Sequence, residues 1–170
     1  EDMRKLVLEL HRQFSMTTIL VTHDREEALG LSDRVAVMSE GGILQIDTPQ
    51  KLYSRPNSPK VADYFGNCTY VEGAVRGSVF TGGTISIDAE VLDGRYRLLL
   101  RPENFLPKEE GSLEVTVESI RFRGSDTLVT FKGAAGLAFS KAYASAPDWK
   151  AGDRLSCGLN ISEPVLFGMD

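Results

Sequence analysis

The pattern of apolar and turn-forming residues changes near Gly66, and this change restricts the fold more than any other feature of the sequence. Before Gly66, stretches with helical periodicity alternate with short β-branched runs. After it, short β-rich segments are separated by Gly, Asp or Pro, and no long helical period occurs. Regularly spaced strands of this kind are typical of a small barrel or sandwich. We therefore expect two domains, residues 1–66 of the α/β class and residues 67–170 of the all-β class.

The first domain is predicted to mix helices with strands of a parallel sheet. Apolar residues at helical spacing predict an amphipathic helix over residues 1–14. The run Thr17–Val21 lacks polar alternation, and such runs suit strands that are buried on both faces. Asp24 is a predicted N-cap for a helix over 25–31, with Glu26 and Glu27 in its first turn. Further predictions are a hairpin of residues 34–38 and 43–46 that turns at Gly41 and Gly42, and helices over 49–53 and 60–65.

The second domain is predicted to contain only strands. They lie near residues 70–76, 84–91, 95–101, 113–123, 127–132, 137–143 and 154–162. The glycine-rich stretch 77–84 is predicted to be a turn. The aromatic residues expected in the core are Phe105, Phe122, Phe131, Phe139 and Trp149.

Composition disfavours several classes of function. The formal net charge is −5, without a basic cluster in either half. Binding to nucleic acid or to an anionic membrane surface relies on clustered Lys and Arg, so both are disfavoured. No apolar run approaches the ~20 residues that cross a bilayer. Cys68 and Cys157 have no metal-ligand or redox spacing, so we expect two reduced thiols and no metal site.

His23 is the first candidate functional residue, because it directly follows a predicted buried strand. In open α/β sheets, ligands bind beyond the carboxyl ends of the strands. An imidazole N–H placed there can donate a hydrogen bond to a phosphate oxygen. A structural or capping role is the alternative for a single histidine at this position. A serine hydrolase that uses His23 is disfavoured, because the sequence has no Gly-x-Ser-x-Gly nucleophile elbow.

The sequence around His23 closely resembles the switch-histidine segment of ABC-transporter nucleotide-binding domains, where a strand is followed by Thr-His-Asp and a Glu-Ala-rich helix. The matching residues are Ile19-Leu20-Val21-Thr22-His23-Asp24-Arg25-Glu26-Glu27-Ala28-Leu29. The resemblance continues through Ser32-Asp33-Arg34, the predicted hairpin, and residues 48–56 and 61–67. This tail is typical of importer ATPases of the polyamine, ferric iron, sulfate and maltose group. Asp47 departs from the pattern, since members often have Gly there.

The resemblance implies a role and partners. His23 would contact the γ-phosphate of ATP, and ATP and Mg²⁺ would be cofactors of the full-length protein. Two subunits would form a homodimer through their ATPase and β domains and drive transmembrane permease subunits, with a solute-binding protein acting indirectly. The protein would be cytoplasmic and peripheral on the inner face of the cell membrane.

The ATP-hydrolysing elements of the family are missing from these residues. A P-loop needs Gly-x-x-x-x-Gly-Lys-Ser/Thr, and the closest stretch, 77–84, has Gly83 in place of the lysine. Ser39-Glu40-Gly41-Gly42 only faintly resembles the family's signature loop. No strand ending in Asp-Glu precedes Glu1, so the catalytic glutamate is absent and the chain reads as part of a longer one. We expect this chain to have no cofactor and no ATPase activity by itself.

Left without neighbouring strands, the run 17–21 is expected to promote association or domain swapping between copies of the chain, or to pack on the barrel.

The second domain resembles the transport-associated OB-type (TOBE) extension of these ATPases. Its marker is Leu100-Arg101-Pro102-Glu103-Asn104, which is similar to the Arg-Pro-Glu-Asp/Asn turn of the family. The resemblance implies an OB-type small barrel, in which Arg101 and Glu103 are candidates to contact a regulatory ligand. A surface turn with a local ion pair is the alternative for these two residues.

Two other functions are compatible with an OB-type domain. The first is an oxyanion-binding module without an ATPase role, although the sequence shows no obvious basic pocket. The second is a single-strand nucleic-acid binder, which the acidic charge balance disfavours.

Overall fold

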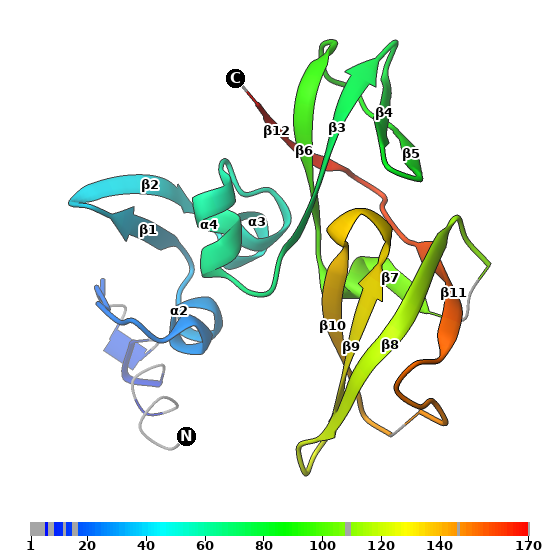
Figure 1. Cartoon of the computed structure of the whole chain (residues 1–170). Coiled ribbons are helices and arrows are strands. Elements are labelled where there is room, and N and C mark those ends of the chain that lie inside the picture. Colours follow the sequence, from blue (N-terminus) through cyan, green and yellow to red (C-terminus); the bar gives the residue numbers. More distant parts are fainter. Residues whose placement is uncertain are drawn as a thin grey trace. The chain divides into compact units, whose positions relative to one another are not determined.

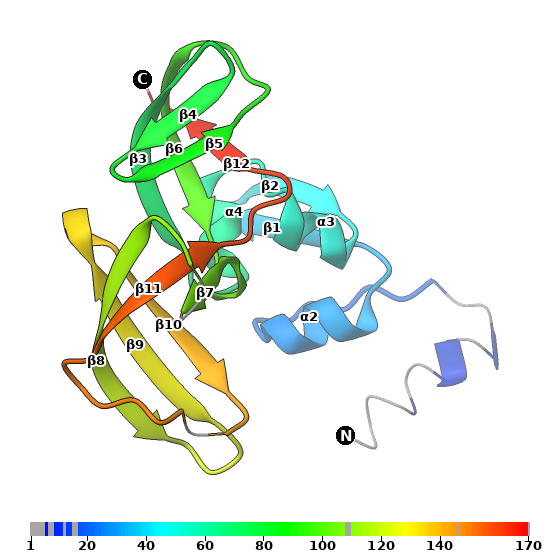
Figure 2. The same ribbon diagram turned by 90° about the vertical axis from the view of Figure 1, so that its right-hand side faces the viewer.

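The computed structural model describes residues 6, 9–11, 13–14, 17–107, 110–145 and 147–169. The chain divides into two compact units, Glu1–Phe65 and Gly66–Asp170. Figures 1 and 2 show the elements of each unit from two directions. Within the described part of the chain, no helix combines the length and the apolar character needed to cross a membrane.

From residue 17 onward, the described part of the first unit contains three short helices and one hairpin. They are α2 (Arg25–Leu31), β1 (Val35–Ser39), β2 (Gly42–Asp47), α3 (Pro49–Ser54) and α4 (Pro59–Tyr64) (Figure 1). Helices α2, α3 and α4 each begin at a side-chain cap, provided by Asp24, Thr48 and Ser58 respectively. Proline follows the cap in α3 and α4, where its missing N–H costs no helical hydrogen bond. The predicted helices over 25–31, 49–53 and 60–65 are therefore confirmed to within one residue at each end.

The hairpin packs one face on the helices and leaves the other exposed. Val35 and Val37 of β1 join Leu52, Val61 and Phe65 in a small buried cluster. The alternate residues of β1 point away from this cluster, because successive side chains of a strand face opposite ways. Met38 is among them and is 62% exposed. The outer face of the hairpin is thus apolar and uncovered within this unit.

Two predictions for the first unit need correction or lie partly outside the described residues. The run Thr17–Val21 forms no strand, and Ile19 and Val21 are 88% and 91% exposed. Within the described residues, the unit's sheet is the antiparallel pair β1–β2, so an α/β ATPase fragment with a parallel sheet is not evident. A strand becomes buried on both faces only when other elements cover it. Of the predicted helix over 1–14, residues 6, 9–11 and 13–14 are helical, and the rest lie outside the described residues.

The second unit is all-β and consists of two antiparallel sheets. The strands are β3 (Thr69–Arg76), β4 (Val79–Gly82), β5 (Ile85–Asp88), β6 (Gly94–Leu100), β7 (Phe105–Pro107), β8 (Leu113–Phe122), β9 (Thr127–Gly133), β10 (Ala138–Tyr143), β11 (Arg154–Leu159) and β12 (Val165–Gly168). One sheet has the order β10-β9-β8-β11-β7 and the other β12-β6-β3-β4-β5. Figure 2 shows β11 running beside both β8 and β7.

Both sheets contribute side chains to one core. Phe80 and Leu98 from one sheet and Phe105 and Phe131 from the other are fully buried in the same cluster. The rings of Phe105 and Phe139 stack with centroids 3.7 Å apart. The short helical turn η1 (Pro102–Asn104) leads from β6 in one sheet to β7 in the other.

The strand predictions for the second unit hold with three omissions, two strands that end early and one misplaced side chain. Strands β5 and β11 end at Asp88 and Leu159, whereas the predictions ran to residues 91 and 162. Strands β4, β7 and β12 were not predicted, and β4 lies inside the stretch 77–84 that was expected to be a turn. Each of these strands has at most four residues, too few for a sequence alternation to stand out. Phe122, which was expected in the core, is 75% exposed, because it ends β8 beyond the buried part of the sheet.

Candidate functional site

His23 lies in the bend before helix α2, and its side chain is exposed. The residues on both sides of it are held in a small hydrogen-bond network. The carboxylate Oδ1 of Asp24 accepts from the backbone N–H groups of Glu26 at 2.8 Å and Glu27 at 3.2 Å. The N–H of Asp24 donates to the hydroxyl of Thr22 at 3.0 Å, and that hydroxyl donates to Oε2 of Glu27 at 2.8 Å. The backbone at His23 is therefore fixed while its ring faces solvent.

This arrangement permits contact with an external ligand. A neutral imidazole carries one N–H donor and one acceptor, so an exposed ring can donate to a phosphate oxygen. The expected position at the rim of a buried sheet is wrong for this structure, because residues 17–22 belong to no strand. The predicted N-cap Asp24, with Glu26 and Glu27 in the first turn of the helix, is confirmed.

Arg101 and Glu103 lie in the corner between β6 and β7, but in contrasting environments. Arg101 is only 4% exposed, whereas Glu103 is exposed on the turn η1. The interpretation of Arg101 as part of a surface turn is therefore wrong. The guanidinium Nη1 of Arg101 donates to the sulfur of Cys68 at 3.6 Å. A direct contact of Arg101 with a regulatory ligand stays a prediction, and in this conformation Glu103 is the accessible member of the pair.

Asn104 connects this corner to a distant part of the chain. Its side-chain oxygen accepts from the N–H of Arg101 at 2.7 Å, and its side-chain amide donates to the carbonyl of Asn160 at 2.8 Å. The N–H of Asn160 in turn donates to the carbonyl of Asn104 at 2.8 Å. Asn160 follows β11, at the start of the connection to β12. The β6–β7 connection and the β11–β12 connection are thus hydrogen-bonded to each other here. The motif at residues 100–104 did not reveal this link.

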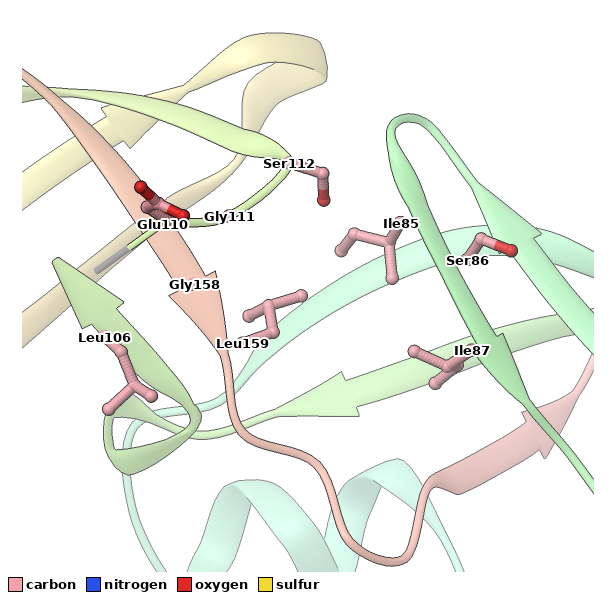
Figure 3. Close-up of a pocket in the computed structure, with 9 residues that line it drawn as sticks. All are labelled: Ile85, Ser86, Ile87, Leu106, Glu110, Gly111, Ser112, Gly158 and Leu159. Carbon is pink, nitrogen blue, oxygen red and sulfur yellow. The ribbon is translucent and has the colours of Figure 1, made fainter. Parts of the chain in front are cut away.

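A hollow of about 300 Å³ lies between strand β5 of one sheet and strands β7 and β11 of the other, beside residues 110–112 (Figure 3). Ile85, Ile87, Leu106 and Leu159 give it an apolar lining, and Glu110 places a carboxylate there. The described residues that line it include no Lys, Arg or His, and a carboxylate repels anions. The described residues around the hollow thus offer an oxyanion, the ligand of the alternative function, no positively charged side chain.

The hollow depends on a close approach of two backbones that the sequence did not suggest. Gly111 lies against β11, and a side chain at this position would collide with the backbone of Gly158, since a Cβ atom would lie 2.5 Å from its Cα. Glycine at position 111 is the one sequence signal that could have indicated this close approach of the two backbones.

Comparison with known proteins agrees with the motifs. The family model of the TOBE domain matches residues 98–167, which lie within the second unit. A spermidine/putrescine import ATP-binding protein of Borreliella afzelii is 37% identical over 132 residues, which are 73% of this chain and 38% of that protein. A sulfate/thiosulfate import ATP-binding protein of Caulobacter vibrioides is 37% identical over 131 residues, covering 76% of this chain and 38% of that protein.

The similarity also reaches into the first unit. A spermidine/putrescine import ATP-binding protein of Mesorhizobium japonicum is 36% identical over 153 residues, and the match covers 82% of this chain and 42% of that protein. This share is larger than the second unit alone can account for. The chain spans less than half the length of these relatives.

Proposed function

Since this chain belongs with the ATP-binding subunits of ABC importers and carries their C-terminal TOBE domain, we propose that it is the C-terminal part of such a subunit, which couples ATP hydrolysis to solute uptake. The observation that carries this proposal is the similarity to importer ATP-binding proteins that runs from the TOBE domain into the first unit. Relatives named for polyamine and for sulfate import match at the same 37% identity, so this identity does not discriminate between those solutes.

Within the complete subunit, His23 contacts the γ-phosphate of ATP. The supporting features are the Thr-His-Asp sequence, the exposed ring and the capped backbone that holds it. Phosphoryl transfer depends chiefly on positioning and on stabilising charge, so one well-placed donor can have a large effect on its rate. His23 is a sensor and transition-state contact in this proposal, and it is not the general base.

The residues of this chain do not fit the remaining parts of an ATP site. The sequence contains no P-loop, and the described residues include no group of three or more His, Cys, Asp or Glu placed to hold a metal ion. ATP and Mg²⁺ are therefore proposed as cofactors of the full-length protein, held mainly by other residues. The first unit is proposed as the part of the nucleotide-binding domain that carries the switch histidine.

The β-rich unit is proposed to serve dimerisation or regulation. Its sheets end in β10, β7, β12 and β5, and the outer edges of these strands are not paired with other strands in the described chain. Such edges carry N–H and C=O groups that can pair with a second copy. The other proposed partners are permease subunits in the membrane and, indirectly, a solute-binding protein, which would hold the subunit at the inner face of the cell membrane.

The test is steady-state ATP turnover by the complete subunit with His23→Ala. Loss of a transition-state donor is expected to lower kcat by about 100-fold or more. His11→Ala is the matched control, because His11 lies outside the Thr-His-Asp motif, and it is expected to keep full turnover. Unchanged turnover in His23→Ala would contradict the proposed role. Robust turnover by the 170-residue chain alone would contradict the wider assignment.

A further inference from the structure

The second unit begins with a short segment, Gly66–Cys68, that enters strand β3, and we call it the junction segment. Two of its residues lie against the side chain of Arg101. The guanidinium Nη1 is 3.6 Å from Sγ of Cys68. It is also 3.7 Å from the position that a Cβ atom would occupy at Gly66, whose φ is +144°. Arg101 therefore contacts the chain where it enters the β-rich unit.

Arg101 is held in place from the other side by the corner between the two sheets. Its backbone N–H donates to Asn104, and its carbonyl accepts from the N–H of Asn104 at 2.9 Å. Asn104 is in turn joined by two hydrogen bonds to Asn160 in the second connection between the sheets. Arg101 thus contacts the junction segment through its guanidinium and the β6–β7 corner through its backbone, and Asn104 links that corner to the β11–β12 connection.

A buried guanidinium is an unusual choice for filling space, because removing this charge from water costs several kcal/mol unless polar groups surround it. A methionine or leucine would fill the same volume without that cost. The planar guanidinium has five donors in a fixed geometry, so it can bind several chain segments at once. At Arg101 the guanidinium reaches two residues of the junction segment, Gly66 and Cys68, while the backbone is joined to Asn104.

We propose that Arg101 is a positioning residue that fixes the junction segment onto the β-rich unit, so that residues 66–68 belong to the folded body of that unit. This role is separate from any contact of Arg101 with a regulatory ligand, and it does not depend on ATP hydrolysis.

The two cysteines allow a direct test in the 170-residue chain. Cys68 lies in the junction segment and is partly exposed, whereas Cys157 is fully buried in the core. The rate at which an aromatic disulfide reagent labels each thiol is measured in the native protein and in Arg101→Met. Release of the junction segment is expected to raise the labelling rate of Cys68 about tenfold, because a charge-assisted contact no longer opposes local opening. Cys157 is expected to stay unlabelled on the same timescale.

The direction in which the Cys68 labelling rate changes distinguishes release of the junction segment from the mere loss of a nearby positive charge. The thiolate is the reactive form, and a neighbouring cation favours it. Removing the guanidinium by itself therefore slows the labelling of Cys68. A faster reaction reports greater access to the sulfur, which only a freed junction segment provides.

Two further variants complete the experiment. Glu90→Gln changes an exposed residue elsewhere in the same unit and is expected to leave both rates unchanged. Arg101→Lys keeps the charge but loses the planar fork, so it is expected to raise the Cys68 rate by less than Arg101→Met does. If Arg101→Met loses its native near-ultraviolet circular dichroism and is therefore not folded, the Cys68 labelling rate of Arg101→Lys decides the test. An unchanged or slower Cys68 reaction in the folded variants overturns the proposal, as does equal acceleration of both thiols in Arg101→Lys.

Discussion

At the scale of single residues, Tyr143 shows how the β-rich unit places a polar atom in its interior. Its hydroxyl is buried and has no hydrogen-bond partner among the described residues. The ring packs edge-on against Trp149, with centroids 5.4 Å apart. Burial, and to a lesser degree the nearby Cys157, raises the pKa of Tyr143 to about 12. Burial likewise raises the pKa of the Cys157 thiol.

This environment predicts a dependence of stability on alkaline pH. Tyrosine in an unfolded chain ionises near pH 10, so the folded state prefers the neutral form more strongly than the unfolded state does. The resulting stabilisation is complete below about pH 10 and is lost as the pH rises to about 12. Tyr143→Phe is expected to remove the loss of stability that Tyr143 causes above about pH 10. It is expected to leave the stability at pH 7 unchanged or slightly higher, because no hydrogen bond disappears.

The measurement is urea unfolding of the native protein and of Tyr143→Phe between pH 7 and pH 11. Tyr64→Phe in the first unit is the control, and its alkaline profile is expected to follow that of the native protein. Identical profiles for all three proteins would show that Tyr143 does not titrate differently in the folded state.

At the scale of elements, the sheet that contains β3 and β4 depends on a glycine with no room for a side chain. A Cβ atom at Gly73 would lie 2.6 Å from Cζ of Phe80, which is fully buried. Gly168 in β12 of the same sheet has nothing within 4 Å of the equivalent position. The two glycines therefore differ in the space around them, although both lie in strands.

This difference predicts opposite outcomes for the same substitution. Gly73→Ala is expected to destabilise the β-rich unit by about 1–3 kcal/mol, as overpacking does in other cores. Gly168→Ala is expected to be neutral or stabilising by less than about 1 kcal/mol, because it reduces the freedom of the unfolded chain. Thermal and urea unfolding of both variants provide the comparison, and equal losses of stability would contradict the packing described for β3.

At the scale of the whole molecule, the two units differ in how completely they bury their apolar residues. The β-rich unit has one extensive core built from both of its sheets. The first unit has a small core and exposes Ile19, Val21 and the outer face of its hairpin. Exposed apolar residues that lie close together favour association between molecules.

The 170-residue chain is therefore expected to self-associate as its concentration rises. Combining Ile19→Lys with Val21→Lys is expected to lower the average mass towards that of a monomer, because charged side chains disfavour burial between copies. Static light scattering over a range of concentrations measures this change. Thr17→Lys adds a charge at an exposed polar position close by and is expected to have a smaller effect. A monodisperse monomer at every concentration for the native sequence would contradict the prediction.

Local sequence determined the features that depend on neighbours along the chain. Asp24 accepts hydrogen bonds from residues two and three positions later, so the start of helix α2 could be predicted without the fold. The hairpin turn at Gly41 and the longer strands of the β-rich unit follow from short-range patterns in the same way. Tertiary structure decided the features that depend on partners far away in the sequence. Strand β4 exists because β3 and β5 pair with it, and Arg101 is buried because segments around Cys68 and Asn104 close over it. The run Thr17–Val21 is apolar enough for a buried strand, yet burial requires covering elements that its own residues cannot specify.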